Sequence, residues 1–174
     1  METLAQIKSN LKALRLRSFL DNLEQRNAEA IQNKMSYIDF LLSLSQDEID
    51  SRRFKKKERA VKNANLGRYK NILDFDFDFN PTINRKKIMD LATCRFISQR
   101  ENVIFVGPAG VGKTCIAKSL GLEACNRGYR VSFIRIAKML EFIYSGKADA
   151  TYQKKLDSFI KPDLLILDDW GMTP

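Results

Sequence analysis

The amino-acid sequence predicts an α/β phosphate-loop domain that follows an all-helical module. The first observation is Gly107–Thr114 (GPAGVGKT), which matches the pattern G-x-x-x-x-G-K-[ST] at every fixed position. The second is Leu164–Asp169 (LLILDD), in which four apolar residues precede two acids. The third is the absence of glycine and proline before Gly67, which favours uninterrupted helices in the N-terminal part of the chain.

The phosphate-loop motif lies in the sequence context that it requires. The apolar, β-prone run Val103–Val106 predicts a strand before the loop, and residues 115–126 predict a helix after it. Glycines let successive N–H groups turn toward an anion, and the helix dipole adds positive potential there. We therefore predict that the loop binds nucleotide phosphates, with Lys113 at the β- and γ-phosphates and the Thr114 hydroxyl on Mg²⁺. The predicted nucleotide contacts are Gly107, Pro108, Ala109, Gly110, Val111, Gly112, Lys113, Thr114 and Cys115.

The second motif predicts a strand that delivers carboxylates to the edge of a sheet. Asp168 is expected beside the Mg²⁺ held by the loop threonine, and Asp169 is expected to orient or deprotonate the attacking water. Apolar strands that end in acids are common, so the motif gains its meaning from its position. Between it and the loop lie a predicted strand, residues 130–134, and predicted helices at 137–144 and 151–160.

Composition excludes several classes of function. Hydrophobic residues make up 44% and charged residues 29% of the chain, and no apolar run approaches the roughly 18 residues of a membrane span. The N-terminus lacks the apolar core of a signal peptide. The chain has no histidine, which excludes His-based catalysis and His-ligated metal by this chain alone. Three cysteines without CxxC spacing indicate a reduced, cytoplasmic setting. The lack of a long apolar run predicts no membrane partner.

Two patterns predict helices near the N-terminus. Leu4, Ile7, Leu11 and Leu14 form an apolar stripe at helical spacing, which fits either core packing or a partner-binding face. The segment Ser36–Asp39 resembles a capping box and predicts a helix that runs into the 50s or 60s.

Positive charge is concentrated in one stretch. The chain carries 30 basic and 21 acidic residues, and Ser51–Lys70 alone carries nine basic residues and one acid, a net charge of +8. A solvated helix face normally mixes both signs, whereas this run has one sign and includes Phe54 and Tyr69. It therefore favours salt-sensitive contact with nucleic-acid phosphates. The predicted DNA contacts are Arg52, Arg53, Lys55, Lys56, Lys57, Arg59 and Lys62.

The pattern changes after residue 70. The alternation of Asp and Phe over residues 74–79 predicts an extended segment with its aromatic side chains on one side, and Asn80-Pro81 predicts a turn. A helix is predicted over residues 83–99. We therefore predict a basic helical DNA- or partner-binding module over residues 1–70 and an ATPase core over residues 71–174.

Taken together, these features resemble a known family. The loop Gly107–Thr114, the segment Leu164–Gly171 (LLILDDWG), the Asp-Phe-Asp-Phe segment and the order of elements are similar to the front part of the IstB-like ATP-binding proteins. These are helper ATPases of bacterial insertion-sequence transposition, related to the DnaC/DnaI helicase loaders within the AAA+ class. The resemblance implies a three-layer AAA+ core that binds ATP and Mg²⁺, assembles as a homo-oligomer on double-stranded DNA, and engages a transposase.

The sequence departs from the family pattern in two respects. Many AAA+ proteins have glutamate where this chain has Asp169, which is one methylene shorter, and slower hydrolysis is therefore expected. The family pattern also continues beyond Pro174 with a sensor strand, an arginine finger and a helical lid. We therefore expect an incomplete core, in a fragment or truncated copy, with strands that cannot take their usual places because the sensor strand normally lies between them.

The sequence leaves two alternatives to the transposition helper open. One is a replicative helicase loader, which would prefer single-stranded DNA and capture a helicase. The other is a switch that binds ATP and DNA without turnover. The sequence does not decide whether this chain hydrolyses ATP.

Overall fold

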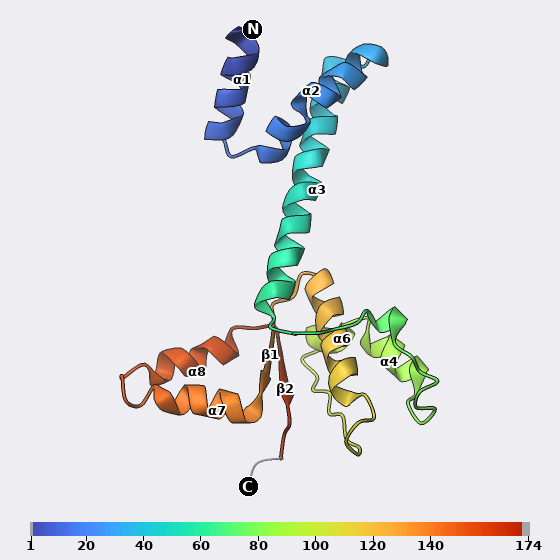
Figure 1. The fold of residues 1–174 in the computed structure, drawn as a ribbon, viewed down its shortest axis with the longest axis vertical. Coiled ribbons are helices and arrows are strands. Elements are labelled where there is room, and N and C mark those ends of the chain that lie inside the picture. The colour runs from blue at the N-terminus through green and yellow to red at the C-terminus, as the bar shows by residue number, and fades with distance from the viewer. Residues whose placement is uncertain (1, 172–174) are drawn as a thin grey trace. The chain divides into compact units, whose positions relative to one another are not determined.

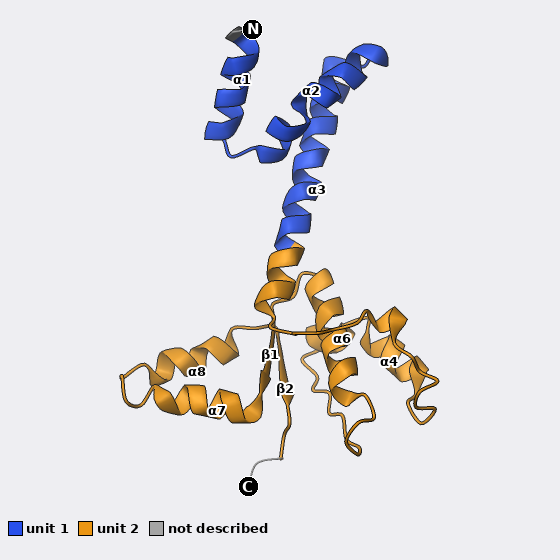
Figure 2. Cartoon of the chain, viewed as in Figure 1, with its two compact units in different colours: residues 1–56 blue, residues 57–174 orange. Residues whose placement is uncertain are grey.

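A computed structural model describes residues 2–171 of the protein. The chain forms two compact units, residues 1–56 and residues 57–174 (Figure 2). Figure 1 labels the main elements, and each unit is described by itself below. None of the described helices is long and apolar enough to cross a membrane.

The first unit consists of three helices. They are α1 (Glu2–Ala13), α2 (Arg17–Gln32) and the N-terminal part of α3 (Tyr37–Asn63). The predicted cap of α3 is confirmed, because the Asp39 N–H donates to Ser36 Oγ at 3.1 Å. The Ser36 hydroxyl in turn donates to Asp39 Oδ2 at 2.6 Å. These bonds satisfy an N–H group that the first turn of a helix otherwise leaves unpaired.

Helices α2 and α3 are joined by buried and half-buried polar groups. Leu44 of α3 is 1% exposed. Beside it, the carboxylate of buried Glu48 accepts the Ser18 N–H at 2.8 Å, near the N-terminus of α2. Arg26 of α2 forms two bonds with Asp47, at 2.7 and 2.8 Å. Burying a carboxylate is tolerated here because it is paired with donors.

The apolar stripe of α1 is only partly covered. Leu11 is half-buried, whereas Leu4, Ile7 and Leu14 are exposed. Core packing therefore accounts for only part of the stripe that the sequence shows.

The second unit is built on a two-stranded parallel sheet. Strand β1 (Val131–Arg135) pairs with β2 (Leu164–Asp168), with Val131 opposite Leu164 and Arg135 opposite Asp168. At the start of both strands Arg130 donates to both oxygens of Asp163, at 2.7 and 3.1 Å. The guanidinium lowers the pKa of Asp163 to about 2. The strands predicted over residues 130–134 and in the second motif are confirmed, and the small parallel sheet fits a phosphate-loop ATPase domain.

Helix α6 (Lys113–Asn126) packs closely on this sheet. A Cβ added to Gly121 would lie 2.8 Å from Ile166 Cδ1 and 3.0 Å from Leu66 Cδ2, so glycine permits the close approach. The surrounding apolar cluster consists of Ala64, Leu66, Cys94, Leu122, Ala124, Cys125, Val131 and Phe133.

The C-terminal end of α3 belongs to this core. Ala60 and Val61 pack against the cluster, and the Phe133 N–H donates to the Ala64 carbonyl at 2.8 Å. These contacts explain why the second compact unit begins within α3, at residue 57, whereas the sequence analysis put the domain boundary near residue 70.

A second apolar cluster anchors the aromatic segment that precedes the loop. Buried Ile72, from the short 3-10 helix η1 (Ile72–Asp74), packs with Ile88 of α4 (Arg85–Leu91) and with residues of α6. Phe75 and Phe77 pack on this cluster, as the alternation predicts, but Phe79 is exposed. The Ile83 N–H donates to the Asn80 carbonyl at 3.1 Å, which confirms the predicted turn.

The prediction of one helix over residues 83–99 is wrong. Helix α4 ends at Leu91, and a separate short helix, α5, covers Arg95–Ser98. Cys94 between them has φ 60°, a left-handed conformation that interrupts a right-handed helix. Its side chain is buried in the first cluster, so packing overrides the local helical pattern.

The prediction of a strand over Val103–Val106 is also wrong. Within residues 2–171, no backbone hydrogen bond joins this segment to β1 or β2, and Ile104 and Val106 are 83% and 90% exposed. A strand requires a partner for its N–H and C=O groups, and propensity cannot replace that partner. Only Phe105 is anchored, against the second cluster.

The two helices predicted between the strands are confirmed. They are α7 (Ile136–Ser145) and α8 (Tyr152–Ile160), which lie side by side in Figure 1. Phe142 and Phe159 meet edge to face, with their ring centroids 5.9 Å apart.

Candidate nucleotide-binding site

The phosphate loop leads directly into the N-terminus of α6. Gly112 precedes the first residue of the helix and has φ 94°, and Gly110 has φ 79°. Both values lie in the left-handed region that favours glycine. A Cβ at Gly112 would also lie 3.2 Å from Phe75 Cζ, so the aromatic segment restricts this position as well. The loop thus directs the first N–H groups of a fourteen-residue helix outward, where an anion can reach them.

Lys113 folds back over the loop. Its ammonium donates to the carbonyl oxygens of Gly107 at 2.8 Å and Pro108 at 2.6 Å. Pro108, Ala109 and Gly110 are exposed, so solvent reaches the loop. The positive charge therefore lies next to the loop and is held only by neutral acceptors.

The two sequence motifs meet in the second unit. The Thr114 hydroxyl, in the first turn of α6, donates to Asp168 Oδ1 at 2.8 Å. Asp168 is the last residue of β2, where the carboxyl end of the strand reaches the loop. Because the two residues are 54 positions apart in the chain, the fold and not the local sequence creates this contact. The remaining loop residues, Val111 and Cys115, are half-buried beside it.

Asp169 lies next to this pair and has a partner that the sequence analysis did not identify. Its Oδ2 lies 3.3 Å from Nε of Arg135, and its side chain is 48% exposed. Its backbone has φ 58°, a left-handed conformation that aspartate tolerates better than most residues. Arg135 is the last residue of β1, opposite Asp168 in the register. Parallel strands end at the same edge, so a basic residue at the end of the predicted strand 130–134 was an available signal.

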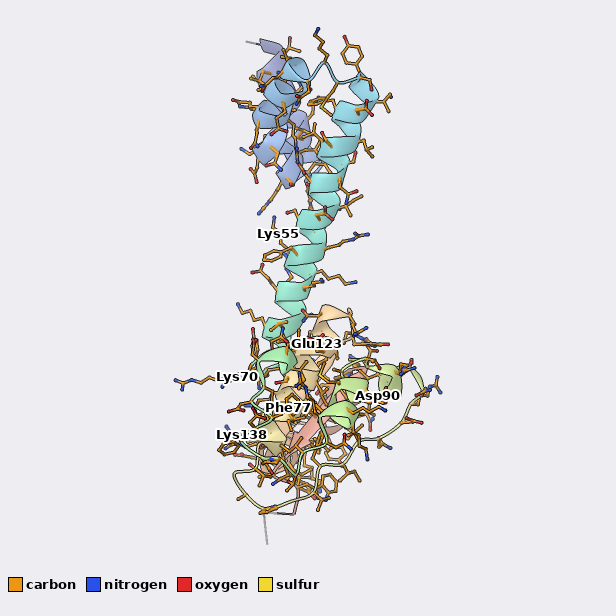
Figure 3. All side chains as sticks on the ribbon, turned by 90° about the vertical axis from the view of Figure 1, so that its right-hand side faces the viewer. Lys55, Lys70, Phe77, Asp90, Glu123 and Lys138 are labelled. Carbon is orange, nitrogen blue, oxygen red and sulfur yellow. The ribbon has the colours of Figure 1, made fainter. Side chains whose placement is uncertain are left out.

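The predicted DNA-contacting residues lie along α3 and contribute nothing to the phosphate loop. Lys55, Lys56, Lys57, Arg59 and Lys62 are all exposed, and Figure 3 shows Lys55 on this helix. The other two predicted contacts have acidic neighbours on the same helix. Arg52 donates to Glu48 at 2.7 Å, and Arg53 lies 3.8 Å from Asp50.

The arrangement of loop, helix and strand can be compared with known proteins. The family model described as "IstB-like ATP binding protein" matches residues 9–174. The chain belongs to the IstB-like ATP-binding protein family. The resemblance drawn from the two motifs is therefore confirmed.

Relatives within the IstB-like family come from several insertion sequences. The chain is 33% identical to the IS232 putative ATP-binding protein of Bacillus thuringiensis subsp. berliner, over 97% of this chain and 68% of that protein. It is 35% identical to the IS5376 protein of Geobacillus stearothermophilus, over 82% and 57% respectively. It is 33% identical to the IS21 protein of Pseudomonas aeruginosa, over 100% and 64%. The matched region thus spans between 57 and 68% of these three relatives.

Proposed function

We propose that this chain binds ATP and is the ATP-binding part of a helper protein of DNA transposition. The observation that carries the proposal is the bond between Thr114 and Asp168, which joins the phosphate loop to the acid of the second motif. Membership of the IstB-like family supports ATP as the nucleotide. The relatives named for insertion sequences support a role in transposition.

The donor set fits a magnesium ion bound together with the nucleotide. Mg²⁺ prefers oxygen ligands, and in phosphate-loop proteins it takes one or two from side chains and the rest from water and phosphate. The Thr114 hydroxyl and the Asp168 carboxylate are two such oxygens, 2.8 Å apart. When bound, the ion would offset the negative charge of the β- and γ-phosphates. Lys113 would exchange the two carbonyl acceptors of the loop for phosphate oxygens.

Asp169 is the best-placed residue to orient a hydrolytic water. Its carboxylate is 48% exposed and follows directly after Asp168. The Arg135 guanidinium lies 3.3 Å from Oδ2 and fixes the position of the carboxylate, whose oxygens can accept a hydrogen bond or a proton from water. A low rate of hydrolysis is expected because the carboxylate is held by Arg135 and has a shorter side chain than glutamate.

The basic run of α3 is proposed to contact double-stranded DNA through its phosphates. Lys55, Lys56 and Lys57 are consecutive exposed side chains of one sign within a single turn of α3. Reversing all three to glutamate should weaken DNA binding and flatten its dependence on salt, because each lost phosphate contact lowers the salt slope by about one. The matched control reverses three lysines of α7, α8 and the segment between them to glutamate: Lys138, Lys147 and Lys154. Unchanged affinity in the α3 variant would remove this part of the proposal.

A second candidate function, the helicase loader, shares the same site. ATP-governed assembly on DNA and capture of a transposase are proposals for the helper, and capture of a replicative helicase belongs to the loader. Phosphate release with duplex, single-stranded or no DNA separates them. Stimulation by duplex DNA supports the transposition helper, and a response to single strands alone supports the loader. If the chain binds ATP but releases no phosphate under any of these conditions, the result supports a switch that binds ATP without hydrolysing it.

The primary test of the proposed site is calorimetric titration of the full chain with ATP in the presence of Mg²⁺. We expect Lys113→Ala to weaken binding roughly 100-fold, because a charge-assisted contact to phosphate is lost. Lys138→Ala, a substitution of an exposed lysine on α7, serves as the matched control and should leave binding unchanged. Equal affinity of both variants for ATP would refute the assignment of the loop.

A further inference from the structure

The N-terminal half of α3 carries apolar residues on two faces. One face bonds to α2 through Glu48, which accepts the Ser18 N–H, and includes Leu44, which is 1% exposed. The other, here called the outer stripe, consists of Ile38, Leu41, Leu42 and Ile49, which are 72%, 52%, 63% and 44% exposed. With 3.6 residues per turn, Leu44 lies on the side of the helix roughly opposite Leu42 and Ile49. The centre of the outer stripe therefore cannot contribute to the contact with α2.

The outer stripe is the clearest uncovered apolar surface among the described residues of the first unit. Four large aliphatic side chains follow one another along about three turns of a single helix, with Ser45 between them. Contiguous exposed apolar surface of this kind marks an interaction site more often than scattered single residues do.

We propose that the outer stripe is a dimer interface, in which α3 packs antiparallel against α3 of a second copy of the chain. The apolar positions suit such a pairing, because Leu42 and Ile49 lie on either side of Ser45. When two copies of α3 cross antiparallel near Ser45, Leu42 of each copy contacts Ile49 of the other. The pair therefore contains this contact two times, once on each side of the two-fold axis. The small Ser45 side chain allows the two helices to approach each other closely.

The charges beside the outer stripe select a second copy as the partner and select the antiparallel direction. Asp39, Gln46 and Arg53 lie seven residues apart along one flank, so all three face the same side of the helix. In an antiparallel pair, Asp39 of each copy faces Arg53 of the other, and Gln46 lies near the two-fold axis. In a parallel pair this flank of one helix lies against the opposite flank of the other, so Asp39 and Arg53 do not meet.

Arg53 is available for this contact. Its side chain is 72% exposed and its distance to Asp50 is 3.8 Å, at the outer limit of an ion pair. Arg52 is less available for a contact with a second copy, because its guanidinium donates to Glu48 at 2.7 Å.

The basic run of α3 also favours the antiparallel pair. Lys55, Lys56 and Lys57 follow the outer stripe directly. In a parallel pair these lysines would lie side by side and repel each other. In an antiparallel pair they lie at opposite ends, which keeps like charges apart and leaves both runs exposed. The interface uses no residue of the phosphate loop, so the proposed dimer forms without nucleotide and is independent of the proposed ATP site.

Sedimentation of the full chain without ATP or DNA tests the interface. We expect a species of twice the 20.0 kDa of one chain, in equilibrium with the monomer. Leu42→Ser with Ile49→Ser should raise the dissociation constant at least roughly 100-fold, because four apolar side chains leave the interface. As a control, Leu73→Ser with Ile160→Ser removes two apolar side chains elsewhere that are more exposed, 72% and 70%, and should leave the dissociation constant unchanged. A monomer at every concentration, or a dimer that the Leu42/Ile49 variant leaves intact, overturns the proposal.

Cysteine cross-linking tests the direction of the pair. Gln46→Cys should form a disulfide-linked dimer on oxidation, because each Gln46 lies near the two-fold axis. Arg53→Cys should not, because the two Arg53 positions lie at opposite ends. A cross-linked Arg53→Cys dimer, or no cross-link with Gln46→Cys, excludes the antiparallel pair. The wild-type chain under the same oxidant controls for Cys94, Cys115 and Cys125.

A charge exchange gives a second, independent test of direction. Arg53→Glu alone should weaken the dimer, and Asp39→Lys combined with Arg53→Glu should restore it, because the two charges then exchange places. Failure of the double variant to recover, with helix content unchanged by circular dichroism, would exclude the pairing of Asp39 with Arg53.

Discussion

The two compact units stabilise their helices by different means. In the first unit the described residues that are buried include only two large apolar side chains, Leu23 and Leu44, together with Ser18 and Glu48. In the second unit the buried residues form two apolar clusters around α6 and β1. The first unit therefore depends on ionised side chains at its helix interface, whereas the second depends mainly on apolar burial.

The difference shows where each unit is sensitive. An apolar core responds to the removal of volume and is little affected by pH, because transfer of apolar surface involves no titratable group. A helix interface held by carboxylates loses stability when those carboxylates are protonated or removed. The following predictions test this contrast, from the largest expected effect to the smallest.

Truncating the apolar core of the second unit should have the largest effect. Leu66 is 1% exposed and packs so tightly against α6 that a Cβ added to Gly121 would lie 3.0 Å from its Cδ2. No neighbour can easily fill the space it leaves, so Leu66→Ala is expected to lower the free energy of unfolding by about 2–5 kcal/mol. Urea denaturation followed by circular dichroism measures the change. Leu73→Ala, at a residue that is 72% exposed, should lower it by less than about 0.5 kcal/mol.

Removing the buried carboxylate of the first unit should have an intermediate effect. Glu48→Ala leaves the Ser18 N–H and the Arg52 guanidinium without their acceptor, which is expected to cost about 1–3 kcal/mol. The same urea denaturation measures it. Glu24→Ala is the matched control, since Glu24 pairs with Lys8 at an exposed position and should leave the midpoint unchanged. Equal effects of the two substitutions would contradict the structural role of Glu48.

Acid should destabilise the first unit through the same groups. The hydrogen bonds from Arg26 lower the pKa of Asp47. Burial raises the pKa of Glu48, but the Arg52 guanidinium and the Ser18 N–H lower it by more, so its net pKa lies below the ordinary value.

The sign of the pH effect follows from these lowered values. A carboxyl group with a lowered pKa in the folded state stabilises it above its unfolded pKa, about 4, and this contribution is lost as the pH falls through the folded value. Thermal denaturation of the chain at several pH values below about 5 should therefore show a falling midpoint. The fall should be smaller in Asp47→Asn, and an identical fall in this variant would exclude Asp47 as a source.

The second unit has one comparable pair, whose effect should come at the lowest pH. It should also be the smallest, because the Arg130 side chain is 70% exposed and solvent screens the pair. Because Arg130 lowers the pKa of Asp163 to about 2, its contribution disappears only as the pH falls from about 4 to 2. Asp163→Asn should therefore reduce the fall of the thermal midpoint at the lowest pH values. It should leave the fall that Asp47 and Glu48 cause at higher pH unchanged. The same pH series of thermal denaturations checks it.

Signals that are local in sequence predicted the fold well. The Ser36 cap fixed the start of α3, and the loop glycines fixed the start of α6. The contact between Thr114 and Asp168 was also predictable, although it is long-range, because both residues were predicted to lie beside the same magnesium ion.

Features that depend on tertiary partners were missed. Val103–Val106 has strand propensity, but no strand pairs with it in the described residues. Residues 83–99 have helical periodicity, but burial of Cys94 in a left-handed conformation divides them. Arg135 was missed because its pairing with Asp169 follows from strand register, and the sequence analysis did not compare the residues at the ends of the two predicted strands.

The most direct test of the central claim is the Mg²⁺ dependence of ATP affinity in Thr114→Ala, Asp168→Asn and the double variant. If both side chains hold one ion, Mg²⁺ should strengthen ATP binding in the wild-type chain and do so far less in either single variant. The double variant should then be little worse than the singles, because residues that act on one ion are not additive. Full Mg²⁺ dependence in Asp168→Asn would contradict the claim that loop and second motif form one site.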